Sequence, residues 1–152
     1  MIFTPDIAAP LGALLGSRRP RAEIVTDDDA AILALIREHY EWTGRDEVRA
    51  SALYADDAAL EFPQSGERIR GRQNIIAFRT AYPAKVTIDM YRTSGSGTLW
   101  VNESTILYDG AEPHGGASIM EFAGGKVVRE RIYIGARWEP PTWRAQWVEM
   151  ME

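Results

Sequence analysis

The sequence predicts an α+β fold in which three N-terminal helices pack on a strongly bent, mainly antiparallel sheet. Apolar residues recur at helical spacing in the first half of the chain and alternate with a period of two after Lys85. A run of helices followed by a run of strands is typical of α+β domains. The chain has 152 residues, of which 45% are hydrophobic, and this suffices for one domain with its own core.

The first helix is predicted to start near Thr26. Thr26 and Asp29 have the spacing of a capping box, with Asp in place of the usual Glu or Gln. An apolar stripe follows, and four of its members fall on one line of the helix: Ile32, Ile36, His39 and Thr43. Gly44 is expected to end this helix.

Asp46 is predicted to cap a second helix that runs to about Tyr54. Asp56 and Asp57 come next, ahead of an apolar strand at 58–63. We expect the two aspartates to form a turn rather than a catalytic pair, because Asp side chains in turns hydrogen-bond to nearby backbone.

Residues 64–71 read as a polar loop, and residues 71–82 as a third helix that Pro83 stops. The remaining strands are predicted where apolar and polar residues alternate: 85–91, 98–108, 117–122 and 127–134. Glycine-rich turns separate them, and neither SGSG nor GGK has the spacing of a phosphate-binding loop.

A carboxylate stands on the apolar face of the last strand. Alternation places Glu130 with Val128, Ile132 and Ile134. Burial raises the pKa of a carboxyl group toward neutrality, so Glu130 is a candidate general acid or base. His39, on the apolar line of the first helix, is the candidate partner in proton exchange. The alternative for both residues is a structural role with a satisfied hydrogen bond.

Three segments resemble the nuclear transport factor 2-like superfamily, in its branch of SnoaL-like polyketide cyclases and ketosteroid isomerase-like proteins. They read LYADDAALEFP, IRGRQNIIAF and ASIMEFAGGKVVRERIYI. The resemblance implies a cone-shaped barrel with a pocket for a small hydrophobic molecule, polyketide- or terpenoid-like, and no cofactor. It implies these pocket-lining, substrate-binding residues: Tyr40, Tyr54, Phe62, Trp100, Asn102, Ser118 and Met120.

The chain departs from ketosteroid isomerases at their catalytic positions. Those enzymes read V-E-D-P where this chain has Leu60, Glu61, Phe62 and Pro63. Phe62 therefore stands in place of their general base, and Ser118 in place of their oxyanion-hole Asp. Steroid isomerisation by that mechanism is not expected.

Composition restricts partners and compartment. The chain has no Cys and two His, which argues against thiol chemistry and a metal site. A net charge of −5 argues against nucleic acid, and no apolar run is long enough to span a membrane. We expect a cytoplasmic protein. The outer strand faces mix apolar and complementary charged groups, and the family resemblance implies a homodimer through this outer sheet face.

Residues 1–25 are predicted to be an N-terminal arm or linker, and residues 26–152 a single domain. Its C-terminal tail carries three of the five tryptophans, which we expect to pack against the end of the barrel. The first functional hypothesis is a cofactor-independent acid–base enzyme: a cyclase, dehydratase, isomerase or hydrolase. The alternative is a non-catalytic module for small-molecule binding or dimerisation.

Overall fold

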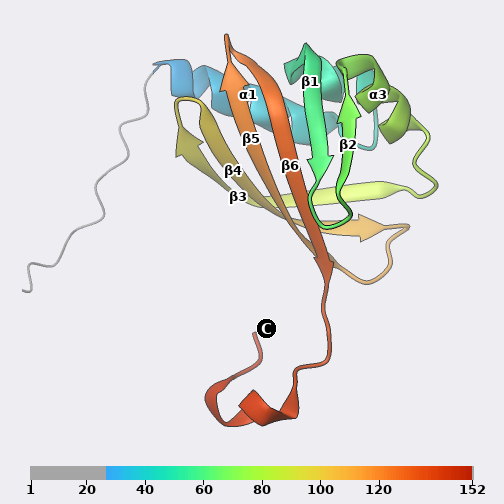
Figure 1. The fold of residues 1–152 in the computed structure, drawn as a ribbon, viewed down its shortest axis with the longest axis vertical. Coiled ribbons are helices and arrows are strands. Elements are labelled where there is room, and N and C mark those ends of the chain that lie inside the picture. Colours follow the sequence, from blue (N-terminus) through green and yellow to red (C-terminus); the bar gives the residue numbers. More distant parts are fainter. Residues whose placement is uncertain (1–26, 152) are drawn as a thin grey trace, which may run out of the picture.

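The structure is a computed structural model that describes residues 27–151 (Figure 1). It is α+β, as predicted, and the predicted N-terminal arm and Thr26 lie outside the described residues. The elements follow one another in this order: α1 (Asp27–Trp42), α2 (Glu47–Ala50), the 3₁₀ helix η1 (Ser51–Leu53), β1 (Tyr54–Phe62), β2 (Glu67–Arg70), α3 (Arg72–Thr80), β3 (Val86–Ser96), β4 (Leu99–Tyr108), β5 (His114–Ala123), β6 (Lys126–Ala136) and the 3₁₀ helix η2 (Thr142–Trp147).

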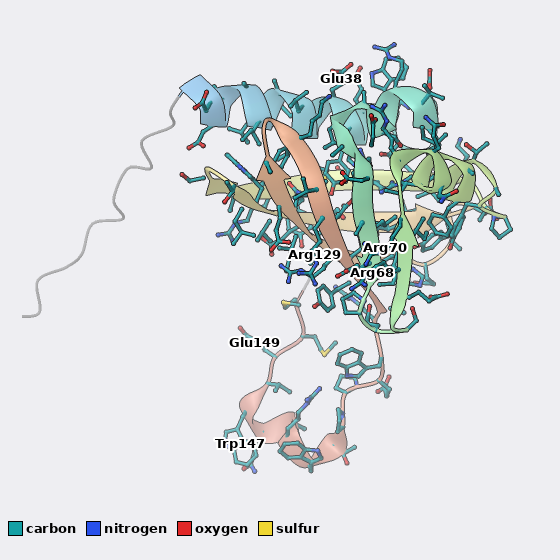
Figure 2. The ribbon with its side chains drawn as sticks, turned by 45° about the horizontal axis from the view of Figure 1, so that its top comes forward. Glu38, Arg68, Arg70, Arg129, Trp147 and Glu149 are labelled. Carbon is teal, nitrogen blue, oxygen red and sulfur yellow. The ribbon has the colours of Figure 1, made fainter. Side chains whose placement is uncertain are left out.

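One mixed sheet contains the six described strands in the order β2-β1-β6-β5-β4-β3. All neighbours are antiparallel except β1 and β6, which run parallel. Figures 1 and 2 show α1 and α3 on the same side of this sheet. The pairing of β1 with β6 joins the N-terminal half of the chain to its last strand.

The core lies between the helices and the inner face of the sheet. Its buried apolar side chains come from both halves of the chain: Ile32, Ile36, Leu53, Tyr54, Ala58, Leu60, Ile75, Trp100, Met120, Phe122 and Val127. Apolar side chains at helical spacing and at alternate strand positions meet here, which is the pattern that the sequence predicts.

The helix N-termini use their aspartates in two ways. Asp46 caps α2 as predicted, and its side chain accepts a hydrogen bond from the backbone N–H of Arg49. Asp29 accepts a hydrogen bond from the backbone N–H of Gly97 at 2.7 Å. This bond joins α1 to the turn between β3 and β4.

Two predictions about residues 56–71 are wrong. Asp56 and Asp57 lie within β1, where the pairing with β6 shifts register between Tyr54 and Ala59. The irregularity leaves both side chains exposed, although alternation would send them to opposite faces. The polar loop predicted at 64–71 contains β2, which pairs with the end of β1 across a tight turn.

A β-bulge also changes the predicted face of Val128. Arg129 pairs with Glu121 and Val127 with Phe122, so Val128 is the extra residue on β6. Val127 is therefore buried and Val128 exposed, which is the reverse of simple alternation. Beyond the bulge the side chains alternate between the two faces of the sheet as predicted, and Glu130 points into the core.

The C-terminal tail leaves the end of β6 and extends away from the sheet (Figure 1). Trp138, Trp143 and Trp147 are 72–75% exposed, so the prediction that they pack against their own domain is wrong. Among the described residues, no helix has the length and apolar character needed to cross a membrane.

Candidate functional site

A buried carboxylate is the centre of a polar cluster in the core. Glu130 on β6 is 0% exposed. The Tyr54 hydroxyl, at the start of β1, donates a hydrogen bond to Glu130 Oε2. The Ser118 hydroxyl on β5 donates to Glu130 Oε1 at 2.5 Å. Each oxygen of this carboxylate therefore has a hydrogen-bond donor, which is what a charge buried in an apolar face requires.

Arg79 on α3 supplies the positive charge of the cluster. Its Nη2 donates to the Tyr54 hydroxyl at 2.9 Å and lies 3.6 Å from Glu130 Oε2. Burial works against the charge of Arg79, but nearby Tyr54 and Glu130 hold the pKa of the guanidinium above its ordinary value. Burial likewise raises the pKa of Tyr54, so this hydroxyl stays protonated.

His39 lies in the same cluster as a neutral ring. Its Nδ1 is 2.6 Å from the carbonyl oxygen of Ala50, and because a carbonyl only accepts, Nδ1 carries the proton. Burial, together with the charge of Arg79, lowers the pKa of His39 to about 4. The Nε2 lone pair is buried and has no hydrogen-bond partner in the described part of the chain.

No hydrogen bond joins His39 to Glu130 in the described structure, so the predicted couple is not a direct one. The Tyr54 ring makes an edge contact with His39, with 5.7 Å between ring centroids, and its hydroxyl reaches Glu130. Tyr54 therefore contacts both predicted catalytic side chains. Their catalytic roles stay predictions.

Tyr40 and Asn102 extend the polar cluster toward α1 and β4. Burial raises the pKa of Tyr40 and nearby Glu130 adds to this, while the Ser118 and Asn102 side chains oppose it. Asn102 Oδ1 accepts from the Thr93 hydroxyl at 3.0 Å. Asn102 Nδ2 is buried without a hydrogen-bond partner among residues 27–151, so it has a donor to offer.

A cavity of about 760 Å³ lies beside this cluster. Its wall is mostly apolar, and these residues contribute to it: Leu60, Phe62, Ile69, Phe78, Tyr82, Val86, Ile88, Ile106, Tyr108 and Ile134. Arg79 also lines the cavity, as do Thr43 and Glu47. Arg79 is thus the residue that connects the cavity with Tyr54 and Glu130.

The predicted binding residues are divided between different places. Phe62 lines the large cavity, and Tyr40 lines a smaller one of about 260 Å³ between α1 and β3. Trp100 and Met120 are buried in the apolar core, where the Trp100 indole N–H donates to the backbone oxygen of Gly97. Tyr54, Asn102 and Ser118 belong to the polar cluster.

Sequence reasoning missed Arg79 and Glu47. Arg79 follows Ile75 by four residues, which puts it on the same face of α3 as a fully buried side chain. The argument that singled out Glu130, a charge on an apolar face, applies equally to this arginine. Glu47 offers no such signal, because the first turn of a helix commonly carries an acidic residue.

A second buried carboxylate lies on the outer face of the sheet. Glu61 on β1 accepts hydrogen bonds from Arg68 at 2.7 Å and from Arg129 at 2.8 and 2.9 Å. Figure 2 shows both arginines on the sheet, away from α1. These hydrogen bonds, from Arg129 first, hold the pKa of Glu61 below its ordinary value. Glu61 does not line the cavity, although its partner Arg68 does, and Glu61 provides a structural counterpart to Glu130.

The donor set suits acid–base and electrostatic chemistry. Among residues 27–151 there is no group of three or more His, Asp or Glu side chains placed to hold a metal ion. A guanidinium at the wall of an apolar cavity can bind an oxygen that becomes negative during a reaction. The carboxylates and hydroxyls around it can hold or transfer a proton.

Comparisons with solved structures place the fold. A nuclear transport factor 2-like protein of unknown function from Burkholderia xenovorans LB400 is 38% identical. That match covers 82% of this chain and 98% of the other, with a TM-score of 0.73. A candidate ketosteroid isomerase from Kribbella flavida is 28% identical over 81% of this chain and 91% of that one, with a TM-score of 0.74.

An epoxide hydrolase from M. tuberculosis shares the fold at 16% identity and a TM-score of 0.59, over 69% of this chain and 83% of that one. No family model and no curated protein matches the sequence.

Proposed function

The chain belongs to the nuclear transport factor 2-like family, and on this premise we propose that it is a cofactor-independent acid–base enzyme. Its substrate is a small, mainly apolar carbonyl compound or epoxide of polyketide or terpenoid type. The reaction is an isomerisation, dehydration, cyclisation or hydrolysis. Structural relatives described as an isomerase and an epoxide hydrolase support this class of chemistry.

The position of Arg79 is the observation that carries the proposal. Its side chain lines the cavity and is also held by the Tyr54 hydroxyl. A fixed positive charge in a mostly apolar wall stabilises the negative charge that develops on a substrate oxygen. Removal of a proton from the carbon next to a carbonyl group creates such a charge. Arg79 therefore binds the substrate oxygen in this proposal.

Glu130 is the proposed proton acceptor, and Tyr54 and Ser118 orient its two oxygens. His39 remains neutral and packs against Tyr54, so it positions the cluster and does not exchange protons directly with Glu130. Glu47 and Glu67 are carboxylates that line the cavity, whereas Glu130 lies behind its wall. A comparison of Glu47 with Glu130 tests which of these two transfers the proton.

One observation favours binding without turnover as the second candidate. Glu130 and Tyr54 are fully buried, and Arg79, Thr43 and Glu47 are the members of this region that line the cavity. In that case Arg79 fixes the orientation of a bound ligand, and Glu130 serves only to balance the charge of Arg79. The cavity suits a small apolar ligand in both candidates.

The test is a turnover and binding screen over enones, hydroxy-ketones and epoxides with three matched variants. Glu130→Gln removes the proposed acceptor, Glu47→Gln removes a carboxylate at the cavity wall, and Glu61→Gln removes a buried carboxylate that does not line the cavity. We expect Glu130→Gln alone to lower the turnover rate, by about 100-fold or more. All three variants should still bind the compound.

Two results would count against this assignment. Loss of turnover in Glu47→Gln with activity kept in Glu130→Gln would transfer the role to Glu47. A wild-type protein that binds the compounds, converts none of them, and changes only in affinity in Glu130→Gln would support the binding module.

A further inference from the structure

The C-terminal tail is a part of the described chain that is not held to the rest by hydrogen bonds or ion pairs. Residues 137–151 make no hydrogen bond or ion pair with residues 27–136, whereas within the tail Arg144 N donates to Pro141 O. The tail nevertheless contains a 3₁₀ helix at Thr142–Trp147. It is a formed segment without a hydrogen-bonding or ion-pair partner among residues 27–136.

The tail exposes several large apolar side chains. They are Trp138, Trp143, Trp147, Val148, Met150 and Met151, exposed by 46–81%. Tryptophan and methionine are enriched, and Ser and Lys depleted, at the centres of protein interfaces. This composition indicates a segment that packs on another protein surface.

The outer face of the sheet has exposed apolar side chains of its own. Leu99 on β4, Val128 and Tyr133 on β6 are 37–48% exposed there. Arg129 and Arg131 stand among them and can lie over tryptophan rings. The tail continues directly from β6, so in a pair of chains packed by their outer faces each tail starts beside its partner.

We propose that residues 137–151 pack on the outer sheet face of a second copy of this chain, so that two chains exchange their tails. This inference is independent of the proposed reaction. It goes beyond the predicted homodimer, because it names the segment that covers the face.

Area and reach both fit this arrangement. Three tryptophans at about 150–250 Å² each, about three-quarters exposed, offer roughly 350–550 Å² per tail. Valine and the two methionines add to this, and two-fold exchange doubles the sum, which approaches the roughly 1,600 Å² of a standard interface. With its six-residue 3₁₀ helix the tail spans up to about 40 Å, whereas six strands at about 4.8 Å spacing are roughly 25 Å wide.

The first measurement is the mass of the full chain in solution by light scattering. We expect twice the 17.0 kDa of one chain. A variant with Trp138, Trp143 and Trp147 all changed to Ser should lose the dimer, or weaken it at least 100-fold. Circular dichroism should show an unchanged fold, because these side chains are about three-quarters exposed in the single chain.

The second measurement uses the absence of cysteine from the chain, which makes every introduced thiol unique. Gln146→Cys places a thiol in the tail, and Thr105→Cys places one on the outer face of β4. The two single variants are mixed, one of them carrying a tag, and cross-linked with a short bifunctional reagent. Because each chain holds one thiol, a tail-to-sheet cross-link forms only between chains.

The matched control replaces Thr105→Cys by Glu38→Cys, which lies on α1, away from the sheet surface that carries Arg68 and Arg129 (Figure 2). The mixture with Thr105→Cys should cross-link at least tenfold more than this control. Equal cross-linking would overturn the proposal. It would also be overturned by a monomer at all concentrations, or by a dimer that the triple Trp variant leaves unchanged.

Discussion

At the scale of single residues, the neutral state of His39 makes stability depend on pH. Its pKa is about 4 in the folded chain and about 6.5 when exposed. Below pH 6.5 the unfolded chain takes up the proton while the folded chain does not, so stability falls as pH falls from 6.5 toward 4. Between pH 7 and pH 5 we expect His39 to account for a loss of about 2 kcal/mol.

Urea unfolding of the wild type and His39→Gln at both pH values measures this loss. Glutamine keeps a donor for the Ala50 oxygen but does not titrate. All other titratable groups are the same in both proteins, so their contributions cancel. An equal pH dependence in the two proteins would contradict a buried neutral His39.

A double-mutant cycle tests the coupling of Arg79 and Glu130. Arg79→Met leaves a buried carboxylate without its cation, and we expect a loss of about 3 kcal/mol of unfolding free energy. Adding Glu130→Gln removes that charge, so the double variant should recover most of the loss. Additive effects in urea denaturation would show that the two side chains act independently.

At the scale of elements, Gly44 fixes how closely the turn after α1 approaches β3. Its φ is +79°, and a Cβ there would lie 2.3 Å from the backbone oxygen of Val86. Gly66 has a similar φ of +76° with open space around it. Both Gly→Ala variants incur left-handed strain of about 1–2 kcal/mol, and Gly44→Ala adds an overpacking cost of about 1–3 kcal/mol.

Urea denaturation of the two alanine variants therefore isolates the free-energy cost of the contact between the added Cβ at Gly44 and the backbone oxygen of Val86. We expect Gly44→Ala to be the less stable protein by at least about 1 kcal/mol. Equal urea midpoints would mean that the turn after α1 moves away from β3 at no cost in unfolding free energy.

Sequence periodicity predicts most elements of this fold, and bulges explain where it fails. Glu130 was recognised because alternation is regular over residues 129–134. Val128 lies one step across a bulge and has the opposite exposure, and Asp56 and Asp57 lie in an irregular part of β1. A bulge shifts the phase of a strand without a change in composition, so single-sequence patterns do not reveal it.

The site was predictable only in part, for a related reason. The buried carboxylate follows from one strand, whereas its contacts with Tyr54, Ser118 and Arg79 depend on how three other elements are placed. The same long-range placement decides which residues line the cavity.

At the scale of the whole molecule, the cavity couples ligand binding to stability. A ligand that binds only the folded chain at 100 times its Kd raises the unfolding free energy by about 2.7 kcal/mol. The thermal midpoint should therefore rise with each compound that the screen identifies. Ile134→Trp fills the cavity wall, and we expect this variant to fold but lose the rise.

The parallel pairing of β1 with β6 has a consequence for how the chain folds. Leu60 pairs with Glu130, its partner 70 residues later in the sequence. Almost the entire domain must therefore be synthesised before β6 can pair with β1. Contacts of this sequence separation slow folding, and the waiting strand is an aggregation risk during synthesis. The step that closes the sheet also brings Glu130 to Tyr54, so a chain truncated before β6 lacks both the finished fold and the site.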